Sequence, residues 1–137
     1  MTIIKRVLAV FVGIMVGGLA VWAVEMLGHY FYPPPANFDF SDKFALEAFI
    51  TNAPFGSKLF IILGYALGSF VGGLITELIA QGKTLATPLI TGTFLMIAGI
   101  INMTDIPHPL WMAITCIAVF IPFAYLGAIV VRKKLAS

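Results

Sequence analysis

Residues 59–76 read LFIILGYALGSFVGGLIT and contain no charged side chain. A helix needs about 20 apolar residues to cross the ~30 Å hydrocarbon core of a bilayer. Lipid offers the backbone no hydrogen-bond partners, so an apolar segment of this length is expected to be helical. Gly64, Gly68 and Gly72 recur at every fourth position and form a stripe along one face. The stretch predicts a membrane-spanning helix with one face open to close helix packing.

Three more segments, at residues 7–24, 84–104 and 109–131, also lack charged side chains. Hydrophobic residues make up 61% of the 137-residue chain and charged residues only 10%, and the mean hydropathy is +1.05. A soluble domain has about 25% charged residues. The sequence therefore predicts a single all-α domain over residues 1–137, an integral membrane bundle of four transmembrane helices. These helices are expected at about residues 7–32, 59–80, 85–104 and 109–131.

The basic residues are distributed unevenly around the four predicted helices. Cytoplasmic loops are enriched in Lys and Arg, and this bias sets the orientation of membrane proteins. With four spans, only Lys43 and Lys58 fall on the side opposite the termini. We therefore expect both termini in the cytoplasm and residues 33–57 as an outer loop. The basic residues on the side of the termini are Lys5, Arg6, Lys83, Arg132, Lys133 and Lys134.

The outer loop contains a short amphipathic pattern, DFSDKFALEAFITNAP, at residues 39–54. Asp39 or Ser41 would cap a helix there, and Asn52 and Pro54 would end it. We expect this helix to lie on the outer membrane surface. It would act either as a lid or partner-docking site, or as a connector that stays near the bilayer. Its apolar face would consist of Phe44, Ala45, Ala48 and Phe49.

Glycines predict how the first two spans pack. Gly13 and Gly17 lie one turn apart in the first span, as Gly64, Gly68 and Gly72 do in the second. Small residues at this spacing let two helix backbones approach closely. Two alternatives follow, namely packing of these spans on each other within one chain and formation of a homo-oligomer.

Glu25 and His29 lie one helical turn apart near the outer end of the first span. Asn102, Asp105 and His108 reach the same depth from the third span and the turn after it. An ionisable group costs roughly 2.5–3.5 kcal/mol at the centre of a span, so Glu25 and His29 are expected to face the bundle interior or water. His108 is the first candidate to meet them.

Three alternatives explain this polar layer. The first is a structural hydrogen-bond network, and the second is a contact to lipid or a partner. The third is a metal or proton site, because imidazole and carboxylate are ligands for divalent metals and histidine titrates near neutral pH. Glu77, at the inner end of the second span, is expected to snorkel or to pair with a basic residue near a terminus.

Catalytic signatures are missing from the sequence. It contains no HExxH motif, no phosphate-binding glycine loop, no CxxC motif and no serine nucleophile beside a base. We therefore do not expect an enzyme. The net charge of +2 is also too small to indicate a nucleic-acid partner.

Two short motifs carry a family resemblance. Glu25 with Gly28 and His29, followed by YPP at residues 32–34, and IPHPLW at residues 106–111 resemble a group of small bacterial inner-membrane proteins with four predicted spans. The resemblance covers nearly the whole chain. It implies the four-span architecture and a bacterial inner (plasma) membrane, and it implies no substrate.

Two functions are therefore expected as alternatives. The first is a structural or accessory subunit of a membrane assembly, with the lipid bilayer and a homo-oligomer or larger complex as partners and no cofactor. The second is a metal-binding or proton-relay protein whose site is the outer Glu25–His29 layer, with a divalent metal as the cofactor.

Overall fold

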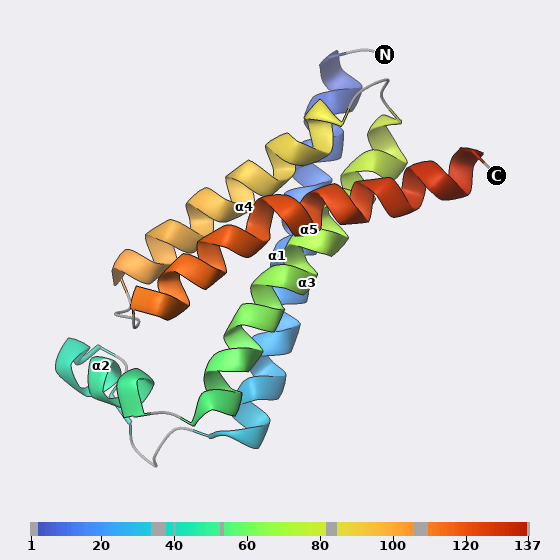
Figure 1. Ribbon diagram of the computed structural model, residues 1–137. Coiled ribbons are helices and arrows are strands. Elements are labelled where there is room, and N and C mark those ends of the chain that lie inside the picture. The colour runs from blue at the N-terminus through green and yellow to red at the C-terminus, as the bar shows by residue number, and fades with distance from the viewer. Residues whose placement is uncertain are drawn as a thin grey trace.

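Helices are the only regular secondary structure in the described part of the chain. The computed structural model describes residues 3–33, 38–39, 41–52, 54–81, 85–105 and 110–136. The all-α prediction is confirmed for these residues. The helices are α1 (Ile3–Phe31), α2 (Lys43–Asn52), α3 (Phe55–Ala80), α4 (Ala86–Asp105) and α5 (Leu110–Ala136) (Figure 1).

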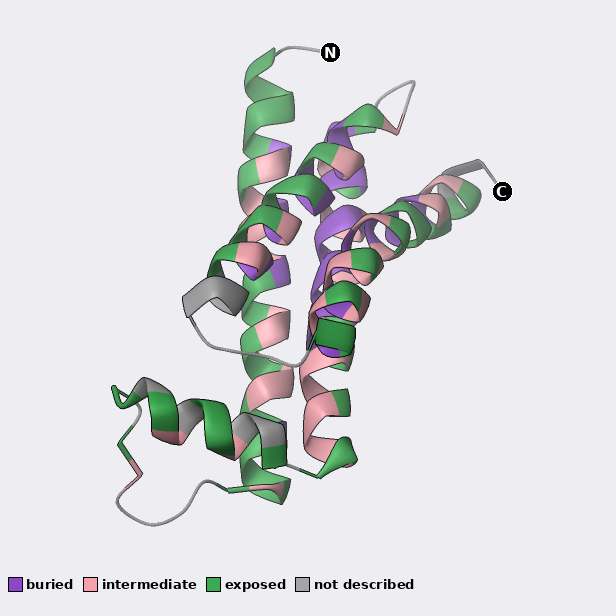
Figure 2. Ribbon diagram, turned by 60° about the vertical axis from the view of Figure 1, so that its left-hand side comes forward, coloured by how far each residue is buried: buried purple, intermediate pink, exposed green. Residues whose placement is uncertain are grey.

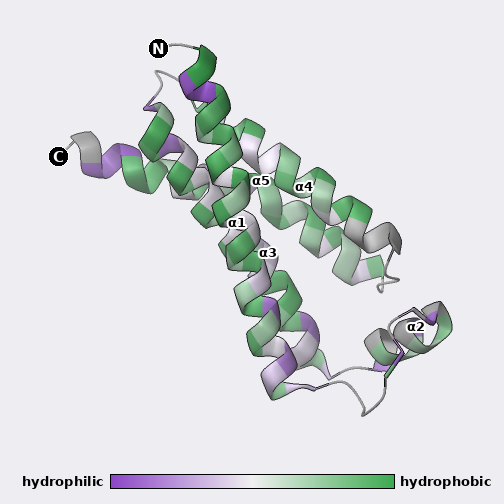
Figure 3. Ribbon diagram, turned by 180° about the vertical axis from the view of Figure 1, so that it is seen from behind, coloured by the Kyte–Doolittle hydropathy of each residue, from purple (hydrophilic) through white to green (hydrophobic). Residues whose placement is uncertain are grey.

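Among the described helices, α1, α3 and α5 are long and apolar enough to cross a membrane, and α4 adds a shorter apolar stretch over Ala86–Ile101. Most residues along these helices are hydrophobic (Figure 3). Large apolar side chains such as Phe11 and Leu19 are more than half exposed. These features fit a helical protein whose outer surface faces lipid.

The helices extend beyond the charge-free segments. α1 begins at Ile3, before the segment at residues 7–24, and α5 continues past Val131 to Ala136. Lys and Arg are good helix formers, so the helix does not end where the apolar segment ends. At 1.5 Å per residue, the 29 residues of α1 span about 43 Å and the 20 residues of α4 about 30 Å.

The two ends of the bundle differ in what they contain. Both termini lie at one end, together with the end of α3 and the start of α4, and α2 lies at the other (Figure 1). We call these the terminal end and the α2 end. The α4–α5 pair is tilted against the α1–α3 pair, so the two pairs separate toward the α2 end (Figures 1 and 3).

The glycine stripes lie where α1 and α3 meet. A Cβ atom on Gly17 would lie 2.7 Å from the carbonyl oxygen of Gly68, and one on Gly72 would lie 3.1 Å from that of Gly13. Gly64 is less crowded, because its nearest atoms are 3.5 Å away on α1. Within one chain, the backbones of α1 and α3 thus approach closely along these five glycines.

A second close contact joins α3 to α5. A Cβ atom on Gly73 would overlap the backbone of Ala124, and one on Gly127 would overlap the carbonyl group of Phe70. Next to this contact, α3, α4 and α5 share an apolar core, and the buried residues gather where these helices cross (Figure 2). The core consists of Tyr65, Leu95, Met112, Cys116 and Phe120.

Asp42 caps α2, rather than Asp39 or Ser41 as the sequence predicted. Its carboxylate accepts hydrogen bonds from the amides of Phe44 (3.0 Å) and Ala45 (3.2 Å). Asp39 instead bonds within the turn before α2, because the amide (2.9 Å) and hydroxyl (2.5 Å) of Ser41 both donate to its carboxylate. Phe44, which was expected on the face toward the membrane, is 86% exposed.

Candidate functional site

The structure places Glu25 and His29 on the outward side of α1. His29 is exposed and Glu25 is partly exposed. Of the two environments expected for His29, the bundle interior and water, the bundle interior is thus excluded. The reason is the buried Gly28, which packs against Phe60 of α3. Successive residues of a helix are turned by about 100°, so the side chain after Gly28 points away from that contact.

The side chains of the other members of the predicted polar layer lie outside the described part of the structure. Asn102 and Asp105 belong to the end of α4, but their side chains lie outside the described residues. His108, the first candidate partner, lies outside them altogether. Within the described ranges, His, Cys, Asp and Glu side chains form no group of three or more that could hold a metal ion.

Thr76 links three helices near the terminal end. Its hydroxyl donates to the carbonyl of Gly72 (2.8 Å), with a longer contact to the carbonyl of Ala9 in α1 (3.3 Å). The hydroxyl of Thr91 in α4 lies 2.7 Å from that of Thr76. Since a hydroxyl has one proton, Thr91 supplies the proton of this second bond. All of these groups are buried, and the bonds hold α1, α3 and α4 in register.

Glu77 lies beside this link and faces α5. It is only 1% exposed, and its Oε1 atom lies 3.5 Å from the Nε atom of Arg132. The expectation that Glu77 pairs with a basic residue near a terminus is thus confirmed. Its Oε2 atom has no hydrogen-bond partner among the described residues. The pair anchors the last turns of α5 to α3.

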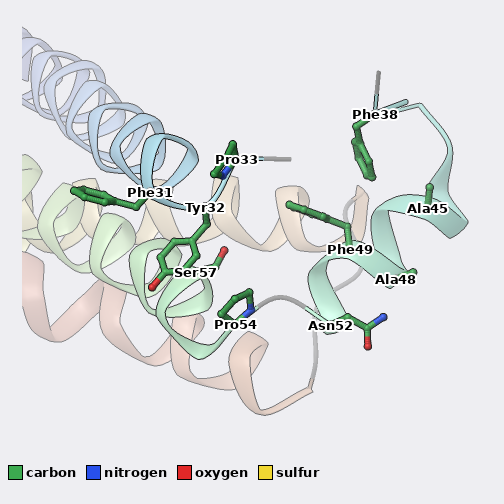
Figure 4. Close-up of a pocket in the computed structure, with 10 residues that line it drawn as sticks. All are labelled: Phe31, Tyr32, Pro33, Phe38, Ala45, Ala48, Phe49, Asn52, Pro54 and Ser57. Carbon is green, nitrogen blue, oxygen red and sulfur yellow. The ribbon is translucent and has the colours of Figure 1, made fainter. Parts of the chain in front are cut away.

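A groove lies at the α2 end, between α2, the end of α1 and the start of α3. Its volume is about 610 Å³, within the range of about 300–1,000 Å³ usual for small-ligand sites. Phe49 extends into it from α2, facing Tyr32 (Figure 4). Phe38 packs against Phe49, with ring centroids 5.1 Å apart. Ala45 and Ala48 also line it from α2, and Asn52 adds a polar group at the end of that helix.

These polar groups offer two kinds of chemistry. Thr76 bonds to Thr91, and Glu77 pairs with Arg132, so these two polar pairs join helices within the chain. Glu25 and His29 instead present a carboxylate and an imidazole on the outward side of a long apolar helix. His29 is therefore accessible from outside this chain, and Glu25 lies one turn before it and is partly exposed.

Comparison with known proteins adds no relative. No protein-family model matches the chain, and neither the curated proteins nor the solved structures contain a significant match.

Proposed function

We propose that this chain is a four-span protein of the bacterial inner membrane, with its termini in the cytoplasm and α2 at the outer surface. The length and composition of α1, α3 and α5 support three of the spans. The ~30 Å length of α4 equals the thickness of the hydrocarbon core and supports the fourth. An even number of spans agrees with two termini at one end, where Arg132 and Lys133 also lie.

We further propose that the protein is a structural or accessory subunit of a membrane assembly. One observation carries this proposal, namely the outward position of Glu25 and His29 on α1. Ionisable side chains within spans are costly and almost always face protein or a water-filled cavity. An ionisable pair at the surface of a lipid-facing helix is therefore expected to meet another protein or water, and the subunit proposal takes the first of these.

The competing function is a metal or proton site at Glu25 and His29. A carboxylate and an imidazole one turn apart supply two ligands of the kind that divalent metals bind. Further ligands would have to come from elsewhere, with Asn102, Asp105 and His108 as the candidates.

Purification in a mild detergent tests the two functions against each other. Light scattering would give the mass of the protein part of the particle, and plasma mass spectrometry its metal content per chain. We expect a particle heavier than one 14.8 kDa chain, without a stoichiometric metal. A monomer with one metal per chain would support the competing function and contradict the subunit proposal.

A further inference from the structure

We propose that the outward face of α1 binds a second copy of this chain, so that two α1 helices meet at the centre of a symmetric dimer. We call Gly18, Trp22, Glu25 and His29 the α1 outer face. This inference rests on the proposed subunit function and deepens it, because it names the partner.

The α1 outer face is one continuous strip that the rest of the chain leaves mostly uncovered. Its residues are spaced by four, three and four positions, which places them on one side of a helix. Gly18, Trp22 and His29 are exposed, and Trp22 is 59% exposed despite its size. Glu25 is partly exposed. The strip thus carries a small residue, a large aromatic ring and two complementary polar groups.

Charge complementarity favours a second copy as the occupant. In a twofold dimer every contact occurs twice, because residue i meets j and residue j meets i. Glu25 offers an acceptor, and His29 offers a donor or a positive charge. A twofold axis along the membrane normal puts equivalent residues at the same depth, so the His29 of the second copy is offset from Glu25 by one helical turn, about 6 Å. Helix side chains tilt toward the N-terminus, so each His29 reaches back toward the Glu25 of the other copy. The strip therefore satisfies both of its polar groups with its own counterpart.

The shape of the α1 outer face also favours a second copy as its partner. A Cβ atom on Gly18 would meet nothing within 4 Å, which is true of no other glycine in the described residues. Its neighbour Gly17 is packed against Gly68 of α3. Gly18 lies one turn from Trp22, and the open space beside it leaves room for the indole ring of Trp22 from the second copy. Close approach at a small residue is a common feature of helix pairs in membranes.

The pair Gly72–Gly73 in α3 gives an internal precedent. Both glycine pairs occur in the same four residues, VGGL. Gly72 packs against Gly13 of α1, and Gly73 packs against Ala124 of α5. Each glycine of that pair therefore serves a different neighbouring helix. In α1 the same pair has one helix beside Gly17 and open space beside Gly18, where the second copy would lie.

Cysteine cross-linking of the full chain in its native membrane tests the position of the contact. Trp22→Cys is expected to form a disulfide-linked species of twice the 14.8 kDa chain mass when the membranes are oxidised. Ala23→Cys is the matched control, because Ala23 is also exposed but is turned by about 100° on α1. Unsubstituted protein controls for Cys116, which is buried. Equal cross-linking at residues 22 and 23 would indicate random collision and overturn the inference.

Reciprocal substitution tests the pairing itself. Glu25→His alone gives two imidazoles per strip, and His29→Glu alone gives two carboxylates. Each variant should lose dimer affinity by about tenfold or more, since its polar groups no longer match. When the two variants carry different tags and are produced together, each should recover the other at the level of the unsubstituted protein. Equal dimer affinity for the Glu25→His variant, the His29→Glu variant and the mixture of the two would overturn the pairing.

The outcomes separate this inference from the function on which it rests. Cross-linking of Trp22→Cys to a protein of another mass would overturn the second-copy proposal and leave the subunit function standing. A chain that cross-links to nothing and is monomeric in native lipid would overturn both.

Discussion

The Oε1 atom of Glu77 lies 3.5 Å from the Nε atom of Arg132, and this ion pair joins α3 to the last turns of α5. Glu77 is almost completely buried, whereas the Arg132 side chain is about one-third exposed. Removing one partner of a buried pair leaves an uncompensated charge, which is the costly change. The two partners should therefore respond unequally to substitution.

Arg132→Leu should destabilise the protein more than Glu77→Leu does. The arginine substitution strands a buried carboxylate, at a cost of up to about 3–5 kcal/mol for a fully buried pair and less here because the guanidinium is partly exposed. The glutamate substitution leaves an arginine that can turn toward water or lipid headgroups. Thermal unfolding in detergent measures both. Lys133→Leu, one position further along α5, is the control, and a loss as large as that of Arg132→Leu would contradict this role of the ion pair.

Thr76→Val should weaken the contact between α3 and α4. Valine keeps the shape of threonine but cannot bond the hydroxyl of Thr91, and such interhelical bonds contribute about 0.6–2 kcal/mol in membranes. Thr91→Val should cost a similar amount, and the double variant should cost less than the sum of both, because the two residues share one bond. Strict additivity of the unfolding free energies would show that the two hydroxyls act independently.

Gly68→Leu should lower the melting temperature of the monomer in detergent, because a side chain at this position would overlap Val21 and the backbone of Gly17. Gly18→Leu is the matched control, since the space around that residue within the chain is open. A large excess of detergent over protein keeps association from contributing to the measurement. Equal melting temperatures for the two variants would mean that α1 and α3 do not pack along their glycines.

Reporter fusions test the topology. Fusions after Ser137 and within residues 81–84 should be active in the cytoplasm, and fusions near Lys43 should be active outside, because the basic residues concentrate at the terminal end. A cytoplasmic signal from the fusion at Lys43 would contradict the four-span arrangement.

Asp42→Ala should loosen α2 by removing its N-cap, which is typically a loss of about 0.5–2 kcal/mol. Faster hydrogen exchange confined to residues 43–52 would report it. Asp39→Ala is the control, because that carboxylate bonds Ser41 and not the helix. Similar exchange in both variants would mean that Asp42 does not hold the helix start.

The turn at Asp39 should be stable to mild acid. The hydroxyl of Ser41, followed by its amide, donates to the carboxylate and holds the pKa of Asp39 below its ordinary value of 3.8. A lowered pKa means that the turn is favoured above the ordinary pKa and is lost as the pH falls through the lowered one. A carbon-13 titration of the Asp39 carboxyl should give a midpoint below 3.8 that returns toward 3.8 in Ser41→Ala. An unchanged midpoint in Ser41→Ala would contradict the hydrogen-bond explanation.

The helices could be predicted from the sequence because lipid leaves the backbone only local hydrogen bonds, so a long apolar segment has one regular form. The contacts between helices were harder to predict. Periodicity shows that Glu25 and His29 share a face, but not which way that face points; the packing of Gly28 on Phe60 decides this. Likewise, Asp39 and Ser41 were the expected caps of α2, but they bond each other in a turn, which leaves Asp42 to cap the helix.

The contact of Gly73 and Gly127 between α3 and α5 was also missed in the sequence. Two adjacent glycines lie on helix faces about 100° apart. The regular glycine stripe predicts a close contact only for the face that contains Gly72. Gly127 gave a weaker signal, because no second glycine lies one turn away in α5. The useful signal would have been the pair itself, since two adjacent glycines can serve two different neighbours.

The tilt between the two helix pairs has a mechanical consequence. At the terminal end, Thr76 and Thr91 meet through a directional hydrogen bond, which tolerates little displacement. At the α2 end, α3 meets α5 through the stacked rings of Phe55 and Trp111, whose centroids are 6.1 Å apart. Stacked rings can slide without leaving a buried polar group unsatisfied. The hydrogen bond thus fixes the two helix pairs to each other at the terminal end. Beside α2, the spacing between the pairs can change.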